Sequence, residues 1–129
     1  MTPWVAVIFH NPWYNSNVAH MGETESVAFR DLWEADLYSR GVDLVASGHV
    51  HAYERSHPVF KGKLDSCGPV HIVIGDGGNR EGLAHDFARE QPVWSAYREA
   101  SYGHGTLDVV NATHAIWKWH RNQVIERRI

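Results

Sequence analysis

Two apolar runs with an amphipathic stretch between them are the feature that most constrains this chain. Residues 4–9 are a continuous apolar, β-branched run of the kind that a buried parallel strand shows. Residues 42–47 form a second such run, which ends at Gly48. Between them, residues 24–40 repeat apolar side chains at three- and four-residue spacing, which indicates a helix that Gly41 would end. A strand–helix–strand unit has a right-handed crossover and parallel strands, so we predict an α/β fold.

Histidines follow both predicted strands directly. His10 comes after the first run, and His49 and His51 follow the second, so all three are expected at one carboxyl edge of the sheet, where open α/β sheets bind ligands. In an extended segment, side chains at i and i+2 point the same way, so His49 and His51 can face one site. Such imidazoles could bind one metal ion or serve two ions about 3.5–4 Å apart. A pair of loop histidines without metal is the alternative, and the shared edge with His10 favours the metal.

The rest of the chain predicts further strands. Residues 69–74 indicate a third strand, and a short hairpin is expected around residues 60–64. Residues 80–100 carry little periodicity, so we predict an irregular excursion with room for one helical turn. Residues 105–110 and 114–120 are β-rich, and the second run has an aromatic face, which predicts an antiparallel hairpin that closes the domain.

Composition and charge exclude several classes of protein. A chain of 129 residues with 43% hydrophobic content is the size of one domain. The net charge of −3 and mixed charge distribution give no basic stripe, so nucleic acid is not an expected partner. No apolar run approaches the roughly 18 residues of a membrane span, and the start leads into a strand rather than a signal peptide. We therefore expect a soluble chain with no membrane partner.

Cysteine and histidine usage narrows the possible sites. Cys67 is the only cysteine, so the chain can build neither a disulfide framework nor a thiolate zinc site within itself. We expect an unpaired loop thiol, with pairing to a cysteine outside the chain as the alternative. Ten histidines are many for this length, so some of them should be metal ligands or proton carriers.

Four motifs carry a family resemblance in order and at fitting separations: residues 10–16, 48–55, 75–79 and 94–99. Together they resemble the C-terminal part of the catalytic domain of a purple acid phosphatase, in its plant and fungal form, within the calcineurin-like metallophosphoesterase superfamily. The resemblance implies the C-terminal half of a metallophosphoesterase β-sandwich with flanking helices. Residues 1–60 would be the C-terminal half of the calcineurin-like domain. Residues 61–129 would be the C-terminal region of the family, packing on the same domain.

The resemblance also implies chemistry at named positions. His10 and His49 match ligands of a divalent zinc, manganese or iron ion, and His51 matches a ligand of the ferric ion. His20 matches a histidine that contacts the phosphate and protonates the leaving group. The implied activity is that of an acid phosphatase, in which a hydroxide activated by the dinuclear Fe(III) and Zn, Mn or Fe(II) centre hydrolyses small phosphate monoesters. We interpret Tyr53, Glu54 and Arg55 as structural residues that orient the ligand loop.

The chain departs from the family pattern in two ways. It has Ala19 before His20, where the plant enzymes have two adjacent histidines. The family's upstream Asp, Gly-Asp-x-x-Tyr and Asn-His ligands have no counterpart, so half of the metal ligands are absent. We therefore expect a fragment that is inactive alone and partners the upstream half of the same domain.

Further properties follow from the resemblance, and one alternative stays open. The full protein would be secreted and could be a homodimer, and Asn111 begins a glycosylation acceptor tripeptide. The alternative to a phosphatase is a non-catalytic, degenerate metal-binding or interaction domain that keeps three histidines.

Overall fold

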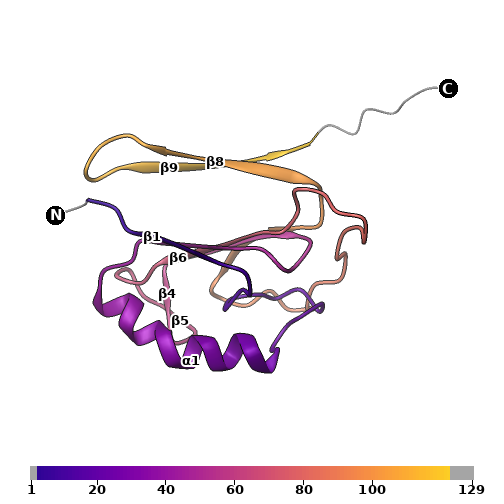
Figure 1. The fold of residues 1–129 in the computed structure, drawn as a ribbon, viewed down its shortest axis with the longest axis horizontal. Helices are drawn as coiled ribbons and strands as arrows, with labels where there is room; N and C mark the ends of the chain where they lie inside the picture. Colours follow the sequence, from indigo (N-terminus) through magenta and orange to yellow (C-terminus); the bar gives the residue numbers. More distant parts are fainter. Residues whose placement is uncertain (1–2, 123–129) are drawn as a thin grey trace.

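The computed structural model describes residues 3–122, which form three layers (Figure 1). A two-stranded hairpin lies on one face of a five-stranded mixed sheet, and a helix lies on the other face. The elements along the chain are β1 (Ala6–Phe9), α1 (Thr24–Ser39), β2 (Leu44–Ser47), β3 (Tyr53–Ser56), β4 (Val59–Phe60), β5 (Lys63–Leu64), β6 (Val70–Ile74), β7 (Ser95–Glu99), β8 (Gly103–Val109) and β9 (Ala115–Arg121).

The main sheet has the order β1-β2-β6-β3-β7. Strands β1, β2 and β6 are parallel, and β3 runs antiparallel to both β6 and β7. The predicted parallel pair is confirmed, with Phe9 opposite Ser47 at its carboxyl end. The expectation that the first strand is buried is wrong, because β1 has a neighbour on one side only within the described sheet and Ile8 is 82% exposed.

Helix α1 covers the face of the sheet that carries Phe9. The Phe29 ring lies edge-on to Phe9 and Trp13, with ring centroids 5.1 and 5.3 Å away. The predicted stop is confirmed, since Gly41 has a φ of +65°, a left-handed conformation that favours glycine. The sheet lies on one side of the helix, and Leu32 is 71% exposed on another. Over residues 3–122, no helix is both long and apolar enough to cross a membrane.

The hairpin β8–β9 is seated on the opposite face by two indoles. Trp119 stacks on Tyr53 with ring centroids 4.6 Å apart and donates from Nε1 to Asp76 Oδ2 at 2.7 Å. Trp117 donates from Nε1 to the Tyr53 hydroxyl at 2.8 Å. A Cβ on Gly105 would lie 2.0 Å from the Trp117 ring, so this position has room only for glycine. The predicted closing hairpin with an aromatic face is confirmed.

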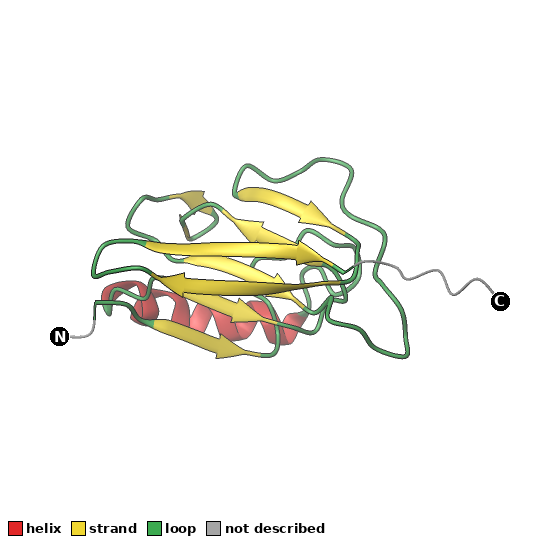
Figure 2. Cartoon of the chain, turned by 90° about the horizontal axis from the view of Figure 1, so that it is seen from above, coloured by secondary structure: helices red, strands yellow, loops and turns green. Residues whose placement is uncertain are grey.

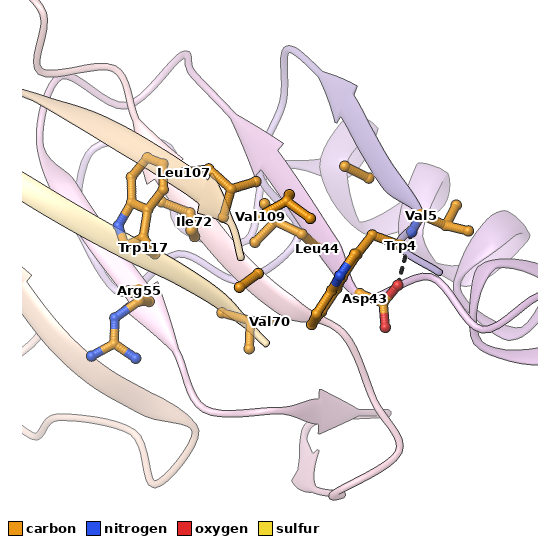
Figure 3. A pocket seen from close by; sticks show the side chains of 12 residues that line it. Trp4, Val5, Asp43, Leu44, Arg55, Val70, Ile72, Leu107, Val109 and Trp117 are labelled. Atoms are coloured by element: carbon orange, nitrogen blue, oxygen red, sulfur yellow. Dashed lines mark hydrogen bonds between the residues drawn. The ribbon is translucent and has the colours of Figure 1, made fainter. Parts of the chain in front are cut away.

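A cavity of about 430 Å³ separates the hairpin from the sheet (Figure 3). Leu107 and Trp117 line it from the hairpin, Ile72 lines it from the sheet, and the Arg55 side chain lies at one end. None of the described residues that line it is a histidine. The cavity is therefore separate from the predicted metal site.

Strands β3 and β7 were not predicted, because their sequences are polar. They pair with each other on the side of β6 away from β1, and Figure 2 shows the sheet and hairpin from above. Both parts of the predicted division, residues 1–60 and 61–129, supply strands to this one sheet, since β6 lies between β2 and β3. The division at residue 60 stays a prediction.

Candidate functional site

His10 and His49 meet at the carboxyl ends of β1 and β2. The backbone ties the two segments together, because the Gly48 amide donates to the His10 carbonyl at 3.1 Å. The two rings meet with 65° between their planes, and His49 Nδ1 lies 3.1 Å from His10 Nε2. The parallel register therefore turns two histidines that are 39 positions apart into a pair.

The spacing of this pair fits a shared metal ion. Two imidazole nitrogens bound to one ion at about 2.0–2.1 Å lie about 2.8–3.4 Å apart when the ligand angle is between ~90° and ~109°. The 3.1 Å separation falls in that range. Neutral imidazole suits zinc, iron and other transition metals, so the donor chemistry fits as well. Without an ion, one ring nitrogen donates a hydrogen bond to the other.

His20 and Glu23 complete the cluster. The Glu23 carboxylate lies 2.5 Å from His20 Nδ1 through one oxygen and 3.0 Å from His49 Nε2 through the other. Residues 20, 23 and 49 thus form a group with metal-ligand character, and the His20 and His49 ring centroids are 4.0 Å apart. The hydrogen bond from His20, and more weakly the one from His49, lowers the pKa of Glu23. A carboxylate behind a ligating imidazole fixes its tautomer and orientation.

The backbone around both imidazoles is left-handed. His20 has a φ of +63° and His49 a φ of +64°, a conformation that is uncommon for residues with a Cβ. The expectation that residues 48–51 are extended is therefore wrong, and the i, i+2 argument does not apply. Val50 and Ala52 are each 1% exposed and anchor this turn in the core. That anchoring supplies the packing that holds His49 in place.

His51 makes its charged contact elsewhere. Its Nδ1 lies 3.8 Å from a carboxylate oxygen of Glu81, and its carbonyl accepts a hydrogen bond from the Ala84 amide at 2.9 Å. The group with metal-ligand character does not include it among the described residues. The structure thus brings together His10, His20 and His49, and the role of His51 as a ferric ligand stays a prediction.

The loop before His20 is a packed structure. Ser16 and Asn17 are fully buried. The Asn15 side chain accepts from the Asn17 amide at 2.8 Å and donates to the Ala19 carbonyl at 3.1 Å. Such local side-chain bonds shape the turn. They place His20 at its end.

Glu54 is the buried centre that fastens this loop to the sheet. Its carboxylate accepts hydrogen bonds from the Ser16 amide at 2.7 Å, the Ser16 hydroxyl at 2.5 Å and the Ser95 hydroxyl at 2.6 Å. Arg98, opposite Glu54 in the β3–β7 register, donates to the Ser16 hydroxyl at 3.0 Å. Glu54 thus ties the loop before His20 to the sheet, and its role in orienting the ligand loop stays a prediction.

Tyr53 and Arg55 lie on the other side of β3, against the hairpin. Tyr53 accepts the Trp117 bond and stacks on Trp119, and burial raises its pKa. Arg55 lines the cavity under the hairpin. Tyr53 therefore joins the hairpin to the sheet, and the predicted role of Tyr53 and Arg55 in orienting the ligand loop stays a prediction.

Asn111 and Cys67 lie away from the cluster. Asn111 is exposed in the turn between β8 and β9, where its side-chain oxygen accepts from the Thr113 amide and hydroxyl at 2.9 and 3.0 Å. Cys67 is exposed and unpaired within residues 3–122, as predicted.

Sequence reasoning missed several residues that build the site. Glu23 carries a usable signal, since it follows His20 by three residues and directly precedes α1. Ser16, Ser95 and Arg98 carry no such signal. Strand pairing and the return of the loop bring Ser16 and Ser95 to Glu54, and Arg98 to Ser16.

Comparison with known proteins gives consistent matches. The family described as iron/zinc purple acid phosphatase-like protein C matches residues 68–127. Purple acid phosphatase 18 of Arabidopsis thaliana is 60% identical over 121 residues, which cover 94% of this chain and 27% of the relative. The phosphoenolpyruvate phosphatase of Allium cepa is 48% identical over 132 residues, again covering 94% and 27%. The chain thus spans about a quarter of the length of these curated relatives.

Solved structures show the same fold. A purple acid phosphatase from yellow lupin (Lupinus luteus) seeds matches 92% of this chain and 23% of its own, with a TM-score of 0.74 and 24% identity. GAP50, the anchor in the inner membrane complex of Plasmodium, matches 92% of this chain and 32% of its own, with a TM-score of 0.65 and 19% identity.

Proposed function

This chain belongs to the purple acid phosphatase family, and from that premise we propose that it supplies part of the active site of an acid phosphatase. The reaction would be hydrolysis of small phosphate monoesters at a dinuclear metal centre. The observation that carries the proposal is the approach of His10 Nε2 and His49 Nδ1 to 3.1 Å, with His20 beside them. Three imidazoles at one sheet edge suit metal binding and proton transfer.

His10 and His49 would hold the divalent ion, and His51 the ferric ion. The ions, when bound, lower the pKa of water and offset the negative charge of the phosphate. Glu23 orients His49, because its carboxylate engages Nε2 and leaves Nδ1 directed at His10. Zinc, manganese and Fe(II) are the candidate divalent ions, and the remaining ligands would come from the upstream half of the same domain.

His20 would handle the proton of the leaving group. Its Nδ1 is engaged by Glu23, so Nε2 is the nitrogen left to face a substrate. A protonated imidazole there donates a hydrogen bond to a phosphate oxygen and then passes its proton to the departing alkoxide.

The family and one relative's name suggest further properties. The name of the Allium cepa relative supports a small phosphate ester as the substrate. Secretion and a homodimer stay proposals for the full protein. Asn111 lies exposed in a turn, where a glycosyltransferase could reach it.

The test uses a full-length purple acid phosphatase that carries this segment. His20→Asn should lower p-nitrophenyl phosphate turnover roughly 10²–10⁴-fold and leave bound metal unchanged. His49→Asn should lower both turnover and metal content. Asparagine is chosen because it tolerates the left-handed backbone of both positions. His114→Gln removes an exposed imidazole of the hairpin and serves as the control.

Two results would contradict these roles. Loss of metal in His20→Asn would make His20 a ligand rather than a proton donor. Full metal content and full turnover in His49→Asn would remove the metal site from this sheet edge and favour the non-catalytic alternative.

A further inference from the structure

A second cavity, of about 260 Å³, opens beside His20. Its walls come from the loop before α1, from the first turns of that helix and from the segment before β7. The side chains that matter here are those of Trp13, Tyr14, His20, Ser26, Arg30 and Trp94. The cavity is separate from the larger one under the hairpin, which shares none of these residues.

Two buried donors, on residues that line this cavity, lack a partner among the described residues. They are the Trp13 indole nitrogen and the Ser26 hydroxyl, on side chains that are 7% and 5% exposed. Buried polar atoms in proteins are nearly always hydrogen-bonded, so an unpaired one calls for an explanation. Neighbouring Asn17, by contrast, is fully buried and bonded at both side-chain atoms. The unpaired donors therefore gather at the cavity rather than throughout the loop.

The charge that lines the cavity is positive. Arg30 is part of the lining, and no aspartate or glutamate among residues 3–122 is part of it. Two carboxylates beside lining residues are engaged: Glu23 binds His20 and His49, while Glu34 accepts from the Tyr14 hydroxyl and the Lys61 amide. The Arg30 guanidinium touches Asp31 at 3.4 Å, which leaves most of its donors free.

We propose that this cavity is a subsite for an anionic group, a carboxylate or a second phosphate, carried by the leaving group of a phosphate ester. An indole nitrogen and a guanidinium only donate hydrogen bonds, whereas an ionised carboxylate or phosphate oxygen only accepts them. The Tyr14 and Trp94 rings, 5.3 Å apart, give the carbon part of the ligand an aromatic wall. The subsite rests on the proposed function, because His20 joins the cavity to the metal edge.

Binding is tested first, without catalysis, on the chain of residues 1–129. The probes are 2-phospholactate and isopropyl phosphate, which differ by a carboxylate in place of a methyl group. The indole N–H resonances of the six tryptophans are followed by NMR, and Trp13→Phe assigns the one that matters. The Trp13 resonance should move with 2-phospholactate and stay in place with isopropyl phosphate at the same concentration. Equal movement of the Trp13 resonance with 2-phospholactate and isopropyl phosphate overturns the subsite. So does no movement with either 2-phospholactate or the bisphosphate of the second arm.

Two variants and a matched control sharpen the binding test. Arg30→Gln should weaken 2-phospholactate binding roughly 10–100-fold, and Ser26→Ala roughly 2–10-fold, the usual worth of a hydrogen bond from a charged and from an uncharged donor. Arg40→Gln removes an arginine at the other end of the same helix, where it pairs with Asp36, and should bind as the unaltered chain does. A second arm uses 1,2-propanediol bisphosphate, and movement of Trp13 with this probe alone identifies the anion as a phosphate.

Kinetics in a full-length enzyme that carries this segment separate the subsite from the proposed function. The ratio of kcat/KM for 2-phospholactate, or for the bisphosphate if that arm binds, to kcat/KM for isopropyl phosphate should fall about tenfold in Arg30→Gln. An enzyme that hydrolyses no ester refutes the proposed function, while the NMR result still decides the subsite. An active enzyme whose ratio is unaltered by Arg30→Gln refutes the subsite and leaves the phosphatase intact.

Discussion

The burial of His71 leads us to predict that the folded chain loses stability in acid. The side chain lies in β6, 3% exposed, and its ring packs 4.6 Å from Tyr14 and 5.9 Å from Trp13. Its Nε2 has no hydrogen-bond partner among the described residues. Burial, with a smaller contribution from the charge of Arg30, lowers the pKa of His71 from 6.5 to about 3. The folded chain therefore keeps this imidazole neutral at any pH above about 3.

The sign and size follow from the two pKa values. Below pH 6.5 the His71 side chain binds a proton in the unfolded chain but not in the folded chain. The stability that neutral His71 allows is therefore fully present above pH 6.5 and is lost as the pH falls. Between pH 8 and pH 5 the loss from this residue is about 2 kcal/mol, and by pH 4 it is about 3 kcal/mol. A phosphatase that works in acid would therefore operate on a weakened fold.

Urea unfolding at pH 8 and pH 5 measures the effect. In His71→Gln the drop in unfolding free energy between the two pH values should be about 2 kcal/mol smaller than in the unaltered chain. The comparison is made within each protein, so any constant cost of the buried amide cancels. His114→Gln, which removes an exposed imidazole, should keep the unaltered pH dependence. An equal drop in His71→Gln and the unaltered chain would refute the reasoning.

Three further changes test the supports of the site and the hairpin. Glu54→Gln replaces one acceptor oxygen by an amide NH2 group that faces the donors of Ser16 and Ser95. It should lower the unfolding free energy, measured in urea, by about 1.5–3 kcal/mol, and a loss under ~0.5 kcal/mol would contradict the network. In the full-length enzyme, Glu23→Gln should weaken divalent metal affinity roughly 10–100-fold in a chelator competition, whereas Glu25→Gln, two residues on, should not. Gly105→Ala places a Cβ against the Trp117 ring and should lower the unfolding free energy by about 1–3 kcal/mol in thermal melts, whereas Gly77→Ala meets nothing within 4 Å and is the control.

The parts of the fold that sequence could predict are those with a strong local pattern. Helix α1 and its glycine stop, the parallel pair β1–β2, strand β6 and both hairpins follow from periodicity and turn residues. Strands β3 and β7 could not be predicted, because their charged side chains become acceptable only once Glu54 finds its serine partners and Arg98 reaches Ser16. Polar strands depend on pairing that a local pattern does not contain.

The site also contains features that a local sequence pattern predicts and others that it does not. The meeting of His10 and His49 follows from parallel strands that end together, which a strand–helix–strand pattern predicts. The direction of His51 could not be predicted, since the left-handed turn at His49 breaks the alternation of an extended chain. The placement of Tyr53 and Arg55 against the hairpin could not be predicted either, because the β8–β9 hairpin lies more than 40 residues further along the chain.

The stack of Trp119 on Tyr53 gives the packing of the hairpin on the sheet a spectroscopic signal. The rings are nearly parallel, with 17° between their planes, and the indole also donates to the buried Asp76 carboxylate. Two coupled aromatic rings held rigidly in an asymmetric setting give strong near-ultraviolet circular dichroism, which is lost when specific packing is lost. Lifting the hairpin would break the stack while leaving helix and sheet in place. The near-ultraviolet signal would then fade before the far-ultraviolet one, which gives this layer an optical signature of its own.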